Sequence, residues 1–293
     1  MRRQFYTLDV FTEVALAGNP LAVVLDSEGL DDSRMQAIAR EFNLAETVFV
    51  KEPRNPVNTA RLRIFTPARE LPFAGHPTIG TAIVLAATGY INSGLDGDLD
   101  IVLEEAIGPI RVAVRMENNV PVFAQLTVYM MPEVGPPPPD RATVAAMLSL
   151  TSDDIVAGAD AIQTVSSGVP YLFVPVVDRA AVGRARPVGN LDGHDVFVFS
   201  RQGENVHARM FAPEFGIIED PATGSAVAAL GGYLADRDTS GTNGTLRWVV
   251  DQGVEMGRPS RLELEVDRVE GRVTAVRVGG SAVLISEGWM RVV

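Results

Sequence analysis

Two segments of the sequence share the pattern x-x-Pro-x-x-Gly-Ser/Thr-Ala, in which a polar residue precedes a proline. The first, residues 75–82, has His76 before its proline, and the second, residues 219–226, has Asp220. Proline favours the first position of a helix, because its φ is already helical and its missing N–H is no loss there. We therefore predict that His76 and Asp220 are the N-caps of two helices. The first-turn N–H groups of such helices could hold a substrate carboxylate and stabilise an enolate.

The two polar residues differ in what they indicate. Aspartate is among the commonest N-cap residues, so Asp220 is compatible with a purely structural cap. Histidine is not a favoured N-cap, so His76 between Gly75 and a proline favours a functional role. The positive end of a helix dipole disfavours imidazolium, so we expect a neutral histidine that donates or relays a proton.

Glu46 is the third residue that could do acid–base chemistry. It opens an apolar segment, residues 47–50, directly after a predicted amphipathic helix. From this position alone, a solvated carboxylate at the end of a strand is the simpler interpretation. The remaining histidines, His194 and His207, are expected at the surface or in strands. Three scattered histidines without any cysteine argue against a metal site.

Composition excludes several classes of protein. The 293 residues are 46% apolar and 21% charged, which is typical of a folded globular chain. The 37 acidic and 25 basic side chains give a net charge of −12, which argues against a nucleic-acid partner. Without cysteine there is no thiol nucleophile, and the only lysine, Lys51, lies in a loop-like context that does not favour Schiff-base chemistry. Neither a P-loop nor a classical dinucleotide fingerprint occurs, so neither of these nucleotide-binding sites is expected.

The N-terminus carries no targeting signal that we can identify. Residues 1–10 alternate in polarity and include Asp9, which is typical of a strand and not of a signal peptide. No apolar run reaches the roughly 18 residues that a membrane helix needs. We therefore expect a cytoplasmic protein without a membrane partner.

Hydrophobic periodicity predicts an alternation of strands and helices. Met35, Ile38, Ala39 and Phe42 share one face of a helix that is capped by Asp32 or Ser33 and ends at Asn43. Further helices are expected over residues 77–89, 140–148, 180–182 and 221–234. Strands are expected over residues 4–10, 21–25, 46–50, 60–65, 101–103, 110–116, 122–128, 171–177, 195–200, 207–211, 261–266, 272–278 and 282–293.

The order of motifs repeats at an offset of about half the chain. Besides the two proline segments, residues 18–20 (Gly-Asn-Pro) are echoed by residues 168–170 (Gly-Val-Pro). We predict two similar halves related by pseudo-symmetry, with a cleft between them. The N-terminal half is residues 1–131, joined by the C-terminal strand 281–293, and the second half is residues 140–280. Residues 132–139, which hold four consecutive prolines, are expected to be a linker outside any helix or ladder.

Several motifs together resemble one family of enzymes. They occupy residues 9–12 (DVFT), 18–23 (GNPLAV), 43–50 (NLAETVFV), 71–78 (LPFAGHPT), 219–226 (EDPATGSA) and 279–283 (GGSAV). In these residues and in their order, the chain resembles the PhzF-like family of phenazine-biosynthesis isomerases over nearly its whole length.

The resemblance implies an α+β fold like that of diaminopimelate epimerase. Each of two pseudo-symmetric halves would be a barrel-like, mostly antiparallel sheet around a central helix, with the active site between the halves. In relatives of that fold the two helix starts carry paired catalytic cysteines. Here, as in PhzF-like proteins, His76 and Asp220 stand in those places, and the glutamate matching Glu46 is the acid/base. The family also implies a homodimer.

The mechanism implied by the resemblance is proton transfer without a cofactor. Glu46 would remove a proton from one carbon of a small, cyclic, unsaturated carboxylic acid and return it to another, while His76 and Asp220 hold and relay protons. The residues implied to bind the substrate are Asn19, Gly75, Thr223, Gly224 and Ser225. In the phenazine enzyme the substrate is trans-2,3-dihydro-3-hydroxyanthranilate. This chain has Ala45 where that enzyme has serine, so the reaction class transfers better than the substrate.

Two alternatives to an isomerase or epimerase stay open. Removal of a proton beside a leaving group would make the same Glu46 the base of a lyase or hydratase. A protein that kept the site without turnover would be a non-catalytic binder of small carboxylates.

Overall fold

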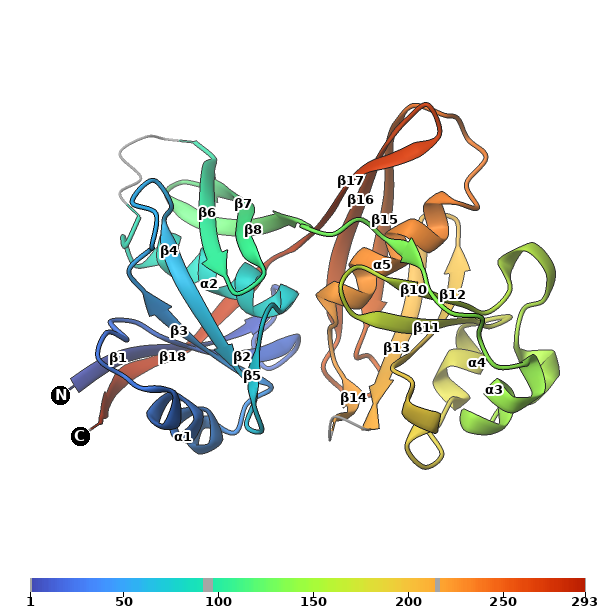
Figure 1. Ribbon diagram of the computed structural model, residues 1–293, viewed down its shortest axis with the longest axis horizontal. Coiled ribbons are helices and arrows are strands. Elements are labelled where there is room, and N and C mark those ends of the chain that lie inside the picture. The colour runs from blue at the N-terminus through green and yellow to red at the C-terminus, as the bar shows by residue number, and fades with distance from the viewer. Residues whose placement is uncertain (1, 92–96, 214–216, 293) are drawn as a thin grey trace. The chain divides into compact units, whose positions relative to one another are not determined.

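The computed structural model describes residues 2–91, 97–213 and 217–292, which form an α+β protein. The chain divides into two compact units. The N-terminal unit comprises Met1–Thr127 and Gly279–Val293, and the C-terminal unit comprises Val128–Val278. Figure 1 labels the elements of both units.

The N-terminal unit contains a mostly antiparallel sheet. Its strands are β1 (Arg2–Val10), β2 (Asn19–Val24), β3 (Glu46–Lys51), β4 (Ala60–Phe65), β5 (Glu70–Leu71), β6 (Leu99–Glu105), β7 (Gly108–Glu117), β8 (Val120–Thr127) and β18 (Ala282–Arg291). Among the described residues of this unit, the pairs β2–β3 and β4–β6 are parallel. The antiparallel pairs are β18–β1, β1–β2, β3–β4, β4–β5, β6–β7 and β7–β8. The two ends of the chain therefore lie side by side in β1 and β18, as Figure 1 shows.

Helix α1 (Asp32–Phe42) covers one part of this sheet. Its N-cap is Asp31, whose side chain accepts a hydrogen bond from the N–H of Arg34, so the predicted cap at Asp32 or Ser33 was wrong by one or two residues. Asn43 ends the helix with φ 50° in the left-handed region, as its position predicts. Of the predicted apolar face, Met35, Ile38 and Ala39 are buried and Phe42 is half-buried, and the helix packs against β3 and β4.

Helix α2 (Gly75–Ala87) lies inside the N-terminal unit. All its residues except the last are buried, and it contacts β1, β2, β3, β7 and β8. A helix that is apolar on every side is stable only when it is surrounded by other apolar elements, as α2 is here. Gly80 makes the close approach possible, because a Cβ there would lie 2.6 Å from Leu21 Cδ2 and 2.8 Å from Val10 Cγ2.

The strands of the C-terminal unit also pair in a mostly antiparallel way. Its strands are β9 (Glu133–Val134), β10 (Gln163–Ser166), β11 (Pro170–Pro175), β12 (Val196–Gln202), β13 (Asn205–Ala212), β14 (Ile217–Asp220), β15 (Gly244–Gln252), β16 (Ser260–Val269) and most of β17 (Arg272–Gly280). Its helices are α3 (Arg141–Met147), α4 (Arg179–Arg184) and α5 (Gly224–Ala235), with short 3₁₀ helices at Ser152–Asp154, Gly158–Asp160 and Leu191–Gly193. Helix α5 is buried except at Ser225.

The order of strand pairings in the C-terminal unit follows that of the N-terminal unit. The pairs β10–β11, β12–β13, β13–β14 and β15–β16 are antiparallel, whereas β11–β12 and β13–β15 are parallel. The buried helix in each unit follows the short strand β5 or β14. A symmetry that relates the two units stays a prediction.

The proline-rich segment differs from its prediction. Residues 132–139 belong to the C-terminal unit, and two of them form β9, which pairs with Val165 and Ser166 of β10. The N–H of Gly135 also donates to the carbonyl of Thr164 (2.9 Å). The non-proline residues of the segment retain their N–H groups, so the ladder forms between the prolines. The units divide at residues 127/128 and 278/279 instead of in a linker at 132–139.

No helix formed by the described residues is both long and apolar enough to cross a membrane.

Candidate functional site

Glu46 lies at the first position of β3, beside Leu21 in the parallel pair with β2. Every residue of β3 is buried, and Glu46 itself is only 8% exposed. The interpretation of Glu46 as a solvated carboxylate at a strand end was therefore wrong. A buried carboxylate needs polar partners, because its desolvation is costly.

His76 supplies such a partner. Its Nε2 lies 3.1 Å from Oε2 of Glu46, and the imidazole is 5% exposed. The histidine is not the N-cap of α2, as was predicted. Ala74 is the N-cap, and His76 is the second helical residue. Proline is accepted throughout the first turn, where N–H groups have no partner within the helix, so its presence did not identify the first position.

Asn19 lies on the other side of the imidazole. Its Nδ2 is 3.3 Å from Nδ1 of His76, and the side chain is completely buried. Proline has no backbone N–H, so the hydrogen bond between the imidazole and the backbone of Pro20 is donated by a ring N–H to the Pro20 carbonyl. The 3.1 Å contact of Nε2 with Oε2 of Glu46 does not have hydrogen-bond geometry. The preceding Gly18 has φ 65°, and a Cβ there would lie 2.4 Å from the Val10 carbonyl, so this turn requires glycine. The structure thus gives Asn19, predicted to bind substrate, a contact with His76.

His76 is uncharged in this environment. Burial lowers the pKa of its imidazole to about 3, and a hydrogen bond with the backbone of Pro20 opposes the shift only in part. The first turn of α2 acts in the same direction, because the positive end of a helix dipole disfavours a second positive charge. The site therefore pairs a carboxyl group with a neutral histidine.

In the C-terminal unit, Asp220 is the last residue of β14 and is opposite Met210 of β13. It is not an N-cap. Helix α5 begins at Gly224, its N-cap is Thr223, and the Thr223 hydroxyl donates to Oδ2 of Asp220 (2.5 Å). The prediction that Asp220 caps a helix beginning at residue 221 was wrong, because β14 extends to Asp220 and the helix starts later.

Gln252 holds this turn together and was not predicted. Its Nε2 donates to the Asp220 carbonyl (2.7 Å) and to Thr223 Oγ1 (3.0 Å), and its Oε1 accepts from the Thr223 N–H (3.2 Å). Gly253 has φ 73°, and a Cβ there would lie 2.6 Å from the carbonyl of Pro221. A glutamine followed by glycine at a strand end is the only sequence signal, and it is a weak one.

The first two residues of α5 directly follow Thr223 and lie beside the turn at Asp220. Gly224 is buried, and Ser225 is partly exposed. The Ser225 hydroxyl lies 2.7 Å from the hydroxyl of Tyr171 on β11, which is 4% exposed. Tyr171 thus orients a residue predicted to bind substrate.

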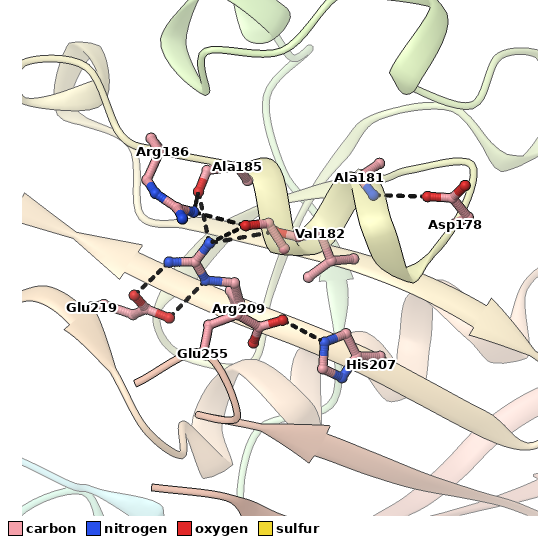
Figure 2. Close-up of polar contacts among 10 residues, drawn as sticks. Asp178, Ala181, Val182, Ala185, Arg186, His207, Arg209, Glu219 and Glu255 are labelled. Carbon is pink, nitrogen blue, oxygen red and sulfur yellow. Dashed lines mark hydrogen bonds and ion pairs between the residues drawn. The ribbon is translucent and has the colours of Figure 1, made fainter. Parts of the chain in front are cut away.

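Strand β14 is anchored by an ion pair next to Asp220. Arg209 on β13 donates from Nε and Nη2 to both carboxylate oxygens of Glu219 (2.8 and 2.7 Å), as Figure 2 shows. Its Nη1 donates to the carbonyl of Ala185 (2.7 Å), where α4 ends. Because Arg209 is only 4% exposed, this bidentate pair holds the strand that ends in Asp220 rigidly.

A second pair nearby involves His207, which was expected in a strand or at the surface. It is a buried residue of β13, and its Nε2 lies 2.8 Å from Oε1 of Glu255 (Figure 2). The pair joins the strand to the segment after β15.

The predicted site residues thus form two clusters. Asn19, Glu46, Gly75 and His76 gather at the start of α2, and Asp220, Thr223, Gly224 and Ser225 gather at the start of α5. That both clusters serve one substrate stays a prediction. Within residues 2–91, 97–213 and 217–292, no group of three or more acidic or histidine side chains is arranged to hold a metal ion.

Comparisons with known proteins identify the family. The sequence profile of the phenazine biosynthesis-like proteins (PhzC-PhzF) matches residues 8–288. An uncharacterized isomerase of Mesorhizobium japonicum is 42% identical, with 98% of each chain covered. The trans-2,3-dihydro-3-hydroxyanthranilate isomerase of Pseudomonas aeruginosa is 34% identical, over 97% of this chain and 98% of that protein.

Comparison with solved structures identifies the same family. The crystal structure of a Bacillus anthracis phenazine biosynthesis protein of the PhzF family matches all of this chain with a TM-score of 0.87 and 25% identity. Profile, sequence and structure agree over nearly the full length. The chain therefore belongs to the phenazine biosynthesis-like (PhzC-PhzF) family and is an isomerase.

Proposed function

We propose that this isomerase moves a proton between two carbons of a small, cyclic, unsaturated carboxylic acid without a cofactor, and that Glu46 is its acid/base. The observation that carries this proposal is the buried contact of 3.1 Å between Glu46 Oε2 and His76 Nε2 at the first turn of α2. It joins a proton acceptor to a helix start suited to an anion.

The helix start is the part of the site that would receive the substrate carboxylate. Gly75 and His76 are the first two residues of α2, so their N–H groups lack partners within the helix. Together with the positive end of the helix dipole, these groups would stabilise a carboxylate and the additional negative charge that develops when the neighbouring carbon is deprotonated.

The reaction balances without a co-reactant. Glu46 takes a proton from carbon, and the electron pair of the broken C–H bond moves into the conjugated system toward the carboxylate. The protonated Glu46 exchanges its acid proton with solvent and then gives a proton to another carbon, and the double bond is left in its new place. His76 stays neutral, and its Nε2, 3.1 Å from Oε2 of Glu46, would help to keep that oxygen oriented.

We extend the proposal to the cluster in the C-terminal unit. The N–H groups of Gly224 and Ser225 at the start of α5 would supply a second set of donors to the same substrate. Asp220 would hold or relay a proton on it. The hydrogen bonds from Thr223 and Gln252 support this role, because they fix the turn at Asp220 and the start of α5 in one geometry.

The proposed substrate class is based on the name of a relative. The Pseudomonas aeruginosa relative is named for trans-2,3-dihydro-3-hydroxyanthranilate, a cyclic unsaturated amino acid. Ala45 directly before Glu46 lacks the serine hydroxyl that the resemblance leads us to expect there. We therefore propose the same reaction class with a substrate that does not depend on that hydroxyl.

Hydrogen exchange at carbon tests the function. The purified protein is incubated in D2O with trans-2,3-dihydro-3-hydroxyanthranilate and with a panel of related cyclic carboxylic acids. Proton NMR and mass spectrometry then follow deuterium incorporation and the shift of the double bond. We expect both in the wild type, and a loss of at least about 100-fold in Glu46→Gln. Glu41→Gln, which changes an exposed carboxylate nearby, is the matched control.

The other outcomes distinguish the alternatives. Exchange that survives Glu46→Gln excludes Glu46 as the base. Loss of water or ammonia from the substrate indicates a lyase, and binding of an acid without any exchange indicates a non-catalytic binder.

The family resemblance also leads us to propose a homodimer. Light scattering at several protein concentrations measures the mass directly, and a monomer of 31.4 kDa at every concentration would contradict it.

A further inference from the structure

Glu105 is a second buried carboxyl group beside α2, and the mechanism above does not use it. It is the last residue of β6 and is 8% exposed. Its Oε1 lies 2.5 Å from Oγ1 of Thr78, and it also bonds to the backbone N–H of Ala74, the N-cap of α2. Glu105 thus contacts the same helix start that carries His76.

The single hydroxyl proton of Thr78 bears on the protonation state of Glu105. Oγ1 of Thr78 lies 2.5 Å from the carboxyl oxygen of Glu105 and 2.7 Å from the carbonyl oxygen of Ala74. A hydroxyl group has one proton and can donate to only one of these two oxygens. Two oxygens at 2.5 Å without a proton between them repel each other. Both contacts are satisfied when Glu105 is protonated and donates to Thr78, and Thr78 donates to Ala74.

We propose that Glu105 is a neutral carboxylic acid that positions the first turn of α2, and that its ionisation weakens this helix start as a binding site for a carboxylate. The second part rests on the function proposed above. Glu105 is a positioning residue, because it acts through Thr78 and Ala74 and does not touch the reacting atoms.

The surroundings of Glu105 support a neutral acid. Burial raises the pKa of its carboxyl group to about 8, although the hydrogen bonds from Thr78 and Ala74 act in the opposite direction. Charged residues on the neighbouring strands lie on the face away from it, as the alternation of burial in β4, β6 and β7 shows; they are Arg61, Arg63, Asp100, Glu104, Arg111, Arg115 and Glu117. On α2 the only titratable group is His76, which is neutral.

Ionisation would act directly on the anion site. A negative charge on Glu105 would sit against the Ala74 N–H and offset the positive end of the α2 dipole. It would also repel a substrate carboxylate bound to the N–H groups of Gly75 and His76. Binding of an anion should therefore weaken as the pH rises through the range in which Glu105 ionises.

The first measurement tests the ligand effect. Anthranilate, a stable aromatic carboxylate with the charge of the proposed substrate class, is titrated by calorimetry into the full-length protein at pH 6.5 and pH 9. We expect affinity to fall about three- to tenfold in the wild type and in Glu104→Gln, which changes the neighbouring carboxylate on the opposite face of β6. In Glu105→Gln, a neutral isostere, the fall should be less than twofold. Thr78→Ser should behave as the wild type.

The second measurement needs no ligand. The folded state holds a proton on Glu105 above the pH at which an unfolded glutamate has lost it, so the folded state binds more protons across this window. The urea midpoint of the wild type should therefore fall relative to that of Glu105→Gln as the pH rises from about 5 to 8, and the infrared band of a protonated carboxyl group should disappear above this window.

The outcomes separate this proposal from the proposed function. An ionised Glu105 at pH 6.5, or identical pH dependence of the urea midpoint in wild type and Glu105→Gln, overturns the neutral acid whether or not the protein catalyses exchange. A neutral Glu105 with equal alkaline loss of anthranilate affinity in both proteins overturns its effect on the anion site. A neutral Glu105 in a protein that neither binds anthranilate nor exchanges any acid overturns the proposed function, and with it the ligand effect.

Discussion

Nε2 of His76 lies 3.1 Å from Oε2 of Glu46, and the two side chains are buried together in the N-terminal unit. The contact joins the first turn of α2 to the first residue of β3. Gly80, one helical turn after His76, allows α2 to approach β1 and β2 closely enough for this contact. Substitutions of the groups that hold these two side chains in place should therefore change activity or stability. The same holds for the groups that fix the turn at Asp220.

The first prediction concerns the amide of Asn19. In Asn19→Asp a carboxylate replaces the amide that lies 3.3 Å from Nδ1 of His76, and a negative charge there favours an imidazolium over the neutral ring. We expect kcat to fall by about 10- to 100-fold with a smaller change in KM. Nitrogen-15 NMR of the imidazole reads its protonation state directly. A variant that keeps both the neutral imidazole and the wild-type rate would show that Asn19 does not set the state of the ring.

The second prediction concerns the charge of His76. Because burial lowers its pKa to about 3, the imidazole should be neutral from neutral pH down to about pH 4. Between about pH 6.5 and pH 3 the unfolded chain binds a proton that the folded chain does not, so the free energy of unfolding decreases as the pH falls through this window, by a few kcal/mol at most.

Two measurements check this charge state. Nitrogen-15 NMR follows the His76 resonance, which is assigned by its absence in His76→Gln. Urea unfolding between pH 7 and pH 4 should show a shallower loss of stability in His76→Gln than in the wild type. A His76 resonance that titrates near pH 6.5 would refute the prediction.

The third prediction concerns the packing of α2. Gly80→Ala places a Cβ within 2.8 Å of both Leu21 and Val10, so either these side chains or the helix must move. We expect a loss of about 1–3 kcal/mol in the free energy of unfolding, measured with urea, because overpacking of a core is costly. A movement of the helix would also take His76 away from Glu46 and lower kcat. Gly241→Ala is the control, since a Cβ there would meet no atom within 4 Å. Equal stability of the two variants would contradict the close approach.

The fourth prediction concerns Gln252. Gln252→Leu removes the amide that bonds to the Asp220 carbonyl and to both the N–H and the hydroxyl of Thr223. Leaving buried polar groups without partners costs about 1–3 kcal/mol each, so we expect a clear loss of stability together with a rise in KM for the carboxylate substrate. Gln202→Leu changes an exposed glutamine at the end of β12 and should alter neither. Unchanged KM in Gln252→Leu would separate the turn at Asp220 from substrate binding.

Much of the secondary structure follows from the sequence. The predicted strand over residues 60–65 coincides with β4, and the strand predicted over residues 46–50 ends only one residue before β3 does. These segments alternate or are rich in β-branched and apolar residues, and such preferences act locally. The starts of α2 and α5 were predicted less well. A proline marks a first turn or the loop before it without distinguishing the two positions, so His76 and Asp220 were wrongly assigned as N-caps.

The sequence also determined which chemistry is available to the protein. It supplies one glutamate before an apolar strand, one histidine between glycine and proline, no cysteine and a single lysine, and these types point to proton transfer by carboxyl and imidazole groups. The tertiary structure decided the state of those groups. Glu46 is buried, His76 is neutral, and Glu105 and Gln252 bond to residues 27 and 29 positions away in the chain. Charge and orientation depend on desolvation and on partners brought together by folding, and no local period in a sequence encodes either.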